Sequence, residues 1–221
     1  KRLMAEYKNV FMVSKAVKHI DGPREVVGKG GNITYAAREL EKIVEEKGIN
    51  PRDVLVTTLD SDNRPHASYF ACLSYVYSVC HDPKYMSFQP IPMFTNNIWD
   101  APAPMRVIAT GNSYWMMIQA LRQHMLRNFS AHAQPLHALI ETDYWSTRTI
   151  VEDGHQFWRS YFAFDGMHEV IPIFLPIYQD AVLADGYRRT LKAQFIQLRR
   201  WAWGASDIAY VAKYAFHTKN K

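Results

Sequence analysis

Two aspartates that follow an apolar run are the first residues of this chain that could do chemistry. Asp60 and Asp62 come directly after residues 54–59, a run that is predicted to form a buried strand. Two residues apart on a tight turn, both carboxylates can face one hard cation such as Mg²⁺ or Mn²⁺, which prefers oxygen ligands and is often shared with a substrate diphosphate. Asp and Ser are also common turn formers, so the motif alone is compatible with a purely structural turn.

A glycine-rich segment precedes the first predicted helix. Gly28-Lys29-Gly30-Gly31-Asn32 can bring backbone N–H groups and one ammonium to a phosphate or a base. It matches neither a Walker A loop nor a dinucleotide-binding fingerprint. The alternative is a flexible loop in which Asn32 caps the helix, and by itself the segment favours that alternative.

Two further motifs lie on predicted helices. Glu152-Asp153 opens one, where the helix dipole stabilises a carboxylate that could accept a proton from a sugar hydroxyl; helix capping is the alternative and is favoured locally. Gln197, Arg200 and Trp201 share one face of another. Arginine can hold diphosphate oxygens in a forked contact, and an indole offers a flat apolar surface to a sugar ring. An amphipathic helix with Trp201 in the core and Arg200 in solvent is the alternative.

The elements around these motifs predict an α/β fold. A strand over residues 9–13, the glycine loop, a helix from Asn32 to the stop at Gly48, and the strand over residues 54–59 together form an α/β crossover. Such a unit favours parallel strands whose carboxyl ends carry the functional loops, and Asp60 lies at such an end.

Further elements follow downstream, and we expect a single domain over residues 1–221. A strand over residues 85–90 should be broken by Pro90 and Pro92. A long helix over residues 105–129, rich in Met and aromatic residues, is assigned to the core rather than to a membrane surface. The other predicted elements are helices over residues 67–80, 152–163, 187–203 and 206–216 and a strand over residues 170–175.

Composition narrows the class of protein. The chain has 221 residues, 48% hydrophobic and 21% charged, which is typical of a folded domain and argues against disorder. Its apolar runs are shorter than the roughly 20 residues that span a bilayer, and we expect it to be part of a longer sequence. Cys72 and Cys80 have no metal-site spacing and suggest a reducing cytosol.

Positive charge gathers near the C-terminus. Residues 185–221 hold eight Lys and Arg against two Asp, within a chain of net charge +5, and they are rich in Trp and Tyr. Such a segment can meet nucleic acid, anionic lipid headgroups or a phosphorylated substrate, or it can be a solvated helix face. Charge alone does not choose among these partners.

The four motifs in this order resemble the family 2 inverting glycosyltransferases, in particular the cellulose-synthase-like branch. The resemblance covers about residues 28–207 and implies the GT-A fold of nucleotide-sugar transferases. That fold is Rossmann-like with a mostly parallel sheet, here without its first strands, followed by C-terminal amphipathic helices. Val151 stands where the family has threonine, and the family's base-reading Asp and membrane helices are not visible in this chain.

The resemblance also implies a role for each motif residue. Asp153 matches the general base. The metal pair corresponds to Asp60 and Asp62. Donor binding falls to Lys29, Gly31, Asn32, Asp60 and Arg200. Acceptor binding falls to Gln197 and Trp201.

The activity implied is a metal-dependent, inverting hexosyl transfer that uses Mg²⁺ or Mn²⁺. We expect the donor to be a nucleoside-diphosphate sugar, in the first place a UDP-sugar, and the acceptor to be the hydroxyl of a saccharide or a lipid-linked sugar. The expected place is the cytoplasmic face of the cell membrane, at the membrane surface and without a nucleic-acid partner. Two alternatives stay open, a nucleotidyltransferase and a non-catalytic carbohydrate- or lipid-binding part of a synthase complex.

Overall fold

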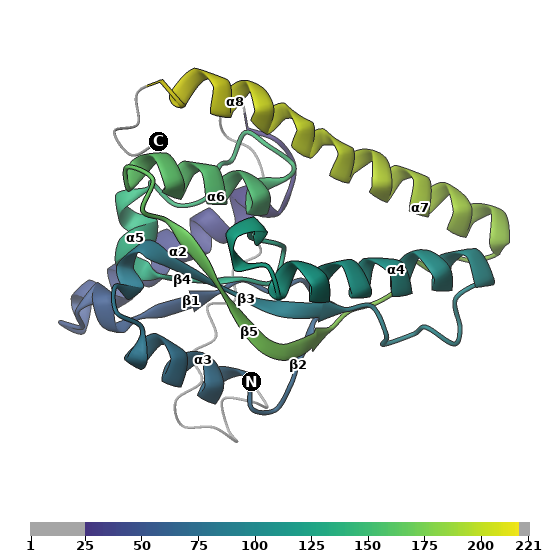
Figure 1. Ribbon diagram of the computed structural model, residues 1–221, viewed down its shortest axis with the longest axis horizontal. Coiled ribbons are helices and arrows are strands. Elements are labelled where there is room, and N and C mark those ends of the chain that lie inside the picture. Colours follow the sequence, from purple (N-terminus) through teal and green to yellow (C-terminus); the bar gives the residue numbers. More distant parts are fainter. Residues whose placement is uncertain (1–24, 217–221) are drawn as a thin grey trace.

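A computed structural model describes residues 25–216, and the strand predicted over residues 9–13 lies outside this range. A five-stranded sheet in the order β1-β4-β3-β5-β2 runs through the middle of the molecule, with helices on both of its faces (Figure 1). The predicted α/β class is confirmed. The strands are β1 (Leu55–Thr57), β2 (Arg64–Pro65), β3 (Met86–Met93), β4 (Ala133–Pro135) and β5 (Glu169–Tyr178).

The sheet is mixed, so the prediction of a mostly parallel sheet is wrong: most of its strand pairs are antiparallel. Among the described strands, β3–β5 is the one parallel pair, although with eight paired positions it is also the longest. The pairs β1–β4, β3–β4 and β2–β5 are antiparallel. Parallel neighbours need a long crossover, and the helices between β3 and β5 supply it, whereas the short strands β2 and β4 simply run back along the sheet.

Prolines lie inside the two longest strands. β3 continues through Pro90 and Pro92, so the break predicted there is wrong, and β5 contains Pro172 and Pro176. A proline has no N–H to donate to the ladder and is usually confined to edges or bulges. The register between β3 and β5 shifts between Pro90 and Ile91, and this irregularity accommodates the missing donors within a central pair of strands.

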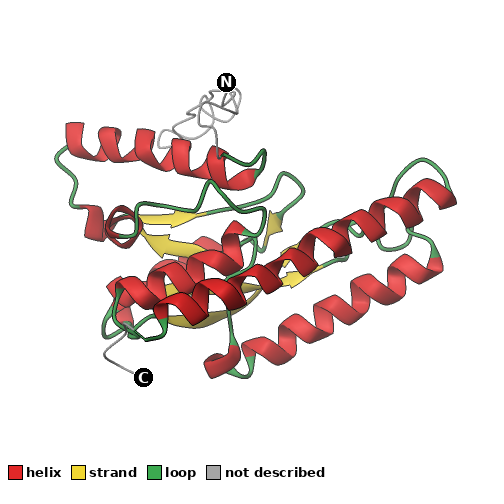
Figure 2. Ribbon diagram, turned by 90° about the horizontal axis from the view of Figure 1, so that it is seen from above, coloured by secondary structure: helices red, strands yellow, loops and turns green. Residues whose placement is uncertain are grey.

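Helices cover both faces of the sheet, and β1 with its flanking residues presents apolar side chains to both. Leu55 and Leu59 pack towards α3, and Val54 and Val56 pack towards α2 and α5. The helices are α2 (Lys29–Glu46), α3 (Tyr69–Val79), α4 (Ala103–Ala120), α5 (Leu136–Glu141), α6 (Glu152–Ala163), α7 (Tyr187–Ala202) and α8 (Asp207–Tyr214). α7 and α8 together form an outer arm along the molecule (Figure 1, Figure 2).

Most predicted helices are confirmed to within a few residues, with two corrections. α2 begins at Lys29, so the glycine-rich segment is the first turn of the helix and not a loop in front of Asn32. The helix expected over residues 105–129 ends at Ala120, and a short 3-10 turn, Gln123–Met125, follows it. Gly48, with φ of 63°, adopts the left-handed conformation just beyond the end of α2, as its assignment as the stop implies.

Within residues 25–216, no helix combines the length and the apolar character needed to cross a bilayer.

Candidate functional site

The first turn of α2 meets the end of β1 at an ion pair. Lys29 Nζ lies 2.8 Å from Asp60 Oδ1 and donates a hydrogen bond to the Ser130 carbonyl oxygen at 2.6 Å. The Thr58 hydroxyl donates to the same carbonyl at 3.0 Å. Three segments that are distant in the sequence therefore converge on one ammonium, namely the start of α2, the end of β1 and the residues before β4.

Gly30 lets α2 come close to the N-terminal end of α6. A Cβ at this position would lie 2.4 Å from the Ser146 carbonyl oxygen and 3.2 Å from Glu152 Cβ, which is closer than side chains pack. A Cβ on Gly31 would meet the Glu25 carboxylate, the far end of a flexible side chain. The requirement for glycine is therefore strict at Gly30, where the obstacle is backbone.

The acidic pair at the start of α6 lies in the electrostatic field of the same ion pair. Glu152 is only 5% exposed, and burial, followed by the negative charge of Asp153, raises its pKa to about 7. Burial also raises the pKa of Asp153, while the Gly154 N–H, which donates to Asp153 Oδ1 at 2.8 Å, and the Lys29 ammonium oppose that rise. Carboxyls with perturbed pKa values cluster at functional sites.

Sequence reasoning missed His132, a buried residue close to this ion pair. Its Nδ1–H donates to the Phe129 carbonyl oxygen at 2.6 Å, and its Nε2 accepts a hydrogen bond from Trp145 Nε1 at 3.0 Å. Burial lowers the pKa of His132 to about 4, so the imidazole is neutral at neutral pH. No motif in the sequence pairs His132 with Trp145, and only the folded chain brings them together.

The second aspartate of the turn faces a different set of partners. Asp60 N–H donates to Asn63 Oδ1 at 2.7 Å, which closes the turn. Asp62 Oδ2 accepts from the Asp180 N–H at 3.0 Å, and its carbonyl accepts from Asn96 Nδ2 at 3.0 Å. Because Asn96 and Asp180 follow β3 and β5, Asp62 lies at the carboxyl ends of the parallel pair.

Asp60 and Asp62 are the residues of this turn that could ligate a divalent cation, although their carboxylates face different partners. No group of three His, Cys, Asp or Glu suited to a metal occurs among the residues that the structure describes. Mg²⁺, however, commonly keeps several waters and takes only one or two carboxylates together with substrate phosphates. Asp60 and Asp62 can provide those two carboxylates. Lys29, already paired with Asp60, adds a positive charge for the phosphates.

The remaining predicted residues lie on α2 and α7. Asn32 Oδ1 is buried and accepts no hydrogen bond from residues 25–216, so it is an acceptor without a donor at the start of α2. On α7, Gln197 accepts from Gln194 Nε2 at 3.2 Å, and Arg200 is exposed. Trp201 is 39% exposed, and its ring lies 6.5 Å from that of Phe94, the residue after β3. The alternative for this helix placed Arg200 in solvent and Trp201 in the core. Arg200 is in solvent, but Trp201 is not in the core.

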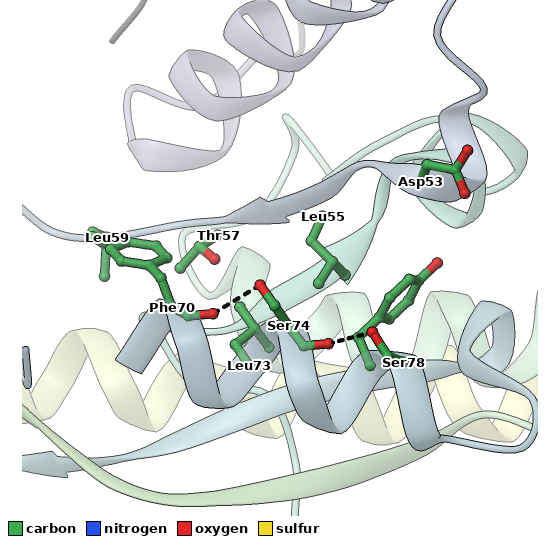
Figure 3. A pocket seen from close by; sticks show the side chains of 9 residues that line it. Asp53, Leu55, Thr57, Leu59, Phe70, Leu73, Ser74 and Ser78 are labelled. Atoms are coloured by element: carbon green, nitrogen blue, oxygen red, sulfur yellow. Dashed lines mark hydrogen bonds between the residues drawn. The ribbon is translucent and has the colours of Figure 1, made fainter. Parts of the chain in front are cut away.

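The structure thus forms a cluster in which Lys29 pairs with Asp60 beside the start of α6, the helix that carries Asp153, while Asp62 and Trp201 lie near the carboxyl end of β3. The contacts described for residues 25–216 do not join Gln197 or Arg200 to this cluster. A separate groove of about 520 Å³ lies between β1 and α3. Figure 3 shows its lining, in which the Ser74 and Ser78 hydroxyls are bonded to carbonyls of their own helix. The Ser74 and Ser78 hydroxyls already donate hydrogen bonds, and Asp53 is the one carboxylate in the lining. The groove therefore offers fewer groups for catalysis than the cluster does.

Comparison with known proteins identifies no relative of this chain. No protein-family model matches the chain, and no curated protein is significantly similar to it. The functional assignment consequently depends on the residues themselves, on their spacing along the sequence and on the contacts described above.

Proposed function

We propose that this chain is the catalytic part of a metal-dependent inverting glycosyltransferase with a GT-A-like fold. It transfers a hexose from a nucleoside-diphosphate sugar, in the first place a UDP-sugar, to a hydroxyl of a saccharide or lipid-linked acceptor. The observation that carries the proposal is the Lys29–Asp60 ion pair, which lies beside the start of α6, the helix that carries Asp153. These are the residues that such a reaction requires for its diphosphate, its cation and its base.

Asp153 acts as the general base in a single displacement. The acceptor oxygen attacks the anomeric carbon, the bond from that carbon to the diphosphate oxygen breaks, and the hydroxyl proton passes to Asp153. Inversion follows because the nucleophile enters opposite the leaving group. Burial raises the pKa of Asp153, which makes its carboxylate a stronger proton acceptor than an exposed aspartate.

Positive charge stabilises the departing nucleoside diphosphate. Lys29 and Arg200 are the side chains assigned to this role, since charge on the leaving group grows in the transition state. Asp60 and Asp62 would hold Mg²⁺ or Mn²⁺, which when bound neutralises phosphate charge. Asn32 and Gly31 belong to the donor side of the site through their place in the first turn of α2. Gln197 and Trp201 are assigned to the acceptor sugar.

A membrane surface is the expected partner of α7, at the cytoplasmic face of the cell membrane. Arg188, Arg189 and Arg199 are exposed on this helix, and so are large apolar side chains such as Phe195, 65% exposed, and Trp203, 61% exposed, just beyond its end. Basic residues beside exposed aromatic rings suit anionic lipid headgroups. Sedimentation with anionic liposomes tests this part of the proposal, with neutral liposomes as the control.

The reaction itself is tested by nucleoside diphosphate release and by Asp153→Asn. The protein is incubated with Mn²⁺ or Mg²⁺ and a panel of nucleotide sugars, with and without saccharide acceptors. General-base help is worth about 10²–10⁴ in rate, so Asp153→Asn should lose transfer by that factor and retain donor binding. The control is Asp82→Asn, which changes an exposed aspartate before β3. Undiminished transfer by Asp153→Asn would remove Asp153 from the mechanism.

The products separate the two alternatives. Release of a nucleoside monophosphate or of pyrophosphate would identify a nucleotidyltransferase, which can also use Asp60 and Asp62 with a metal. The absence of any metal-dependent nucleotide-sugar binding would favour a non-catalytic carbohydrate- or lipid-binding part of a synthase complex. Salt-sensitive binding of DNA or RNA would instead assign the basic arm to nucleic acid.

A further inference from the structure

A hydrogen bond between a histidine and an aspartate joins α6, the helix that carries Asp153, to the C-terminal arm. His155 Nδ1 lies 2.6 Å from Asp207 Oδ1, and the two side chains are only 14% and 13% exposed. His155 comes two residues after Asp153, and Asp207 is the first residue of α8. The two residues are 52 positions apart in the sequence, so their bond joins distant segments. None of the roles assigned above involves His155 or Asp207.

Aromatic rings shield this pair from solvent. The His155 ring packs against Tyr210 with centroids 4.5 Å apart, and Tyr210 in turn packs against Phe162 at 5.9 Å and against Tyr214 at 4.6 Å. An exposed ion pair contributes little, whereas a shielded hydrogen bond to a carboxylate is short and stronger. The contact between α6 and α8 therefore has a polar centre with an aromatic rim.

The contact reaches the α7 residues through a short connection. A 3-10 turn, Trp203–Ser206, joins the end of α7 directly to the start of α8. Arg200 and Trp201 lie in the last turn of α7, a few residues before that turn. Any movement of α8 away from α6 must therefore displace the end of α7, because only one short turn separates the two helices.

We propose that the His155–Asp207 bond is a positioning contact that sets the place of the Gln197/Arg200/Trp201 face relative to Asp153. The inference rests on the glycosyl-transfer function proposed above. On the donor side, Lys29 and Asp60 belong to α2 and to the end of β1 and do not depend on the arm, whereas Arg200 moves with it. His155 and Asp207 hold the arm that carries Arg200 and the acceptor residues Gln197 and Trp201, and they take no part in the chemistry themselves.

Loosening the arm should slow sugar transfer to the acceptor more than it slows hydrolysis of the donor. A misplacement of about 1 Å can cost on the order of 10²-fold in rate when two reactants must meet. Water needs no positioning by Trp201, so hydrolysis of the donor can continue: its oxygen attacks the anomeric carbon, the nucleoside diphosphate leaves, and the proton passes to Asp153. The ratio of transfer to hydrolysis is therefore the readout that a merely structural role would not move.

The experiment compares Asp207→Ala with Asp207→Asn and with Lys192→Ala, an exposed position on α7. Asp207→Asn keeps an oxygen that accepts the bond from His155 Nδ1–H. For Asp207→Ala we expect a 10–100-fold lower ratio of transfer to hydrolysis and a raised acceptor KM. The donor KM should rise by a smaller factor, because Arg200 is the one assigned donor residue that lies on the arm. Asp207→Asn should restore most of the ratio, and Lys192→Ala should leave it as it is.

Hydrogen exchange provides a second measurement that needs no activity. Asp207→Ala should raise amide exchange in α7 and α8 at least about tenfold while β3 and β5 keep their protection. Wild-type exchange in the arm, or an equal fall in donor hydrolysis and transfer, would overturn the proposal. If the wild-type protein transfers no sugar at all, the proposed function fails, and the exchange data alone decide whether the bond holds the arm.

Discussion

Replacing Glu152 by glutamine should stabilise the protein at neutral and alkaline pH and have little effect in acid. The pKa of this carboxyl rises from 4.5 to about 7 on folding, chiefly through burial. The folded state therefore keeps a proton that the unfolded state loses between pH 4.5 and 7, and stability falls as the pH rises through that window. At 1.36 kcal/mol for each pKa unit, ionised Glu152 costs the folded state about 3 kcal/mol above pH 7.

Urea unfolding at pH 4 and pH 8 measures this cost. Glu152→Gln keeps the shape of the side chain and removes the charge, so the variant should exceed the wild-type free energy of unfolding by about 3 kcal/mol at pH 8 and match it at pH 4. Glu46→Gln, at an exposed position at the end of α2, is the control and should show no such dependence. A difference for Glu152→Gln that is the same at both pH values would refute the assignment of a buried, raised-pKa carboxyl.

Two further substitutions test the packing around the site. Gly30→Ala should cost about 1–3 kcal/mol because the new methyl group would meet the Ser146 carbonyl, whereas Gly111→Ala, with nothing within 4 Å, should stabilise α4 by about 0.5–1 kcal/mol. Trp145→Phe should cost about 1–3 kcal/mol because the buried His132 Nε2 loses its donor. Urea unfolding checks each value, and equal stabilities for Gly30→Ala and Gly111→Ala would contradict the close contact.

Local signals were enough to predict most elements of this chain. The apolar periodicity and the Gly48 stop marked α2, and the apolar run before Asp60 marked β1. The Lys29–Asp60 ion pair was not predicted, although both residues belong to motifs that the sequence singled out. The predictions of the elements succeeded because helix ends, turns and short strands depend mainly on neighbouring residues.

Long-range pairing was not accessible in the same way. The rule that proline interrupts a strand failed at Pro90, because the irregularity that accommodates it depends on β5, some eighty residues later. His132 and Trp145 meet only because β4 runs antiparallel to β1 and α5 folds back on it. The direction of each strand is decided by its partner, so the mixed sheet could not be derived from the spacing of elements along the chain.

The central strands and the edge strand β1 differ in how they resist association between molecules. The central strands contain Pro90, Pro92, Pro172 and Pro176, and proline disfavours the stacking of strands into fibrils. β1 lies at one end of the sheet, and residues 54–59 around it, Val-Leu-Val-Thr-Thr-Leu, contain neither proline nor charge. Natural edge strands usually carry one of these protective features. The aggregation hazard of the described chain is therefore concentrated along β1, next to the groove against α3.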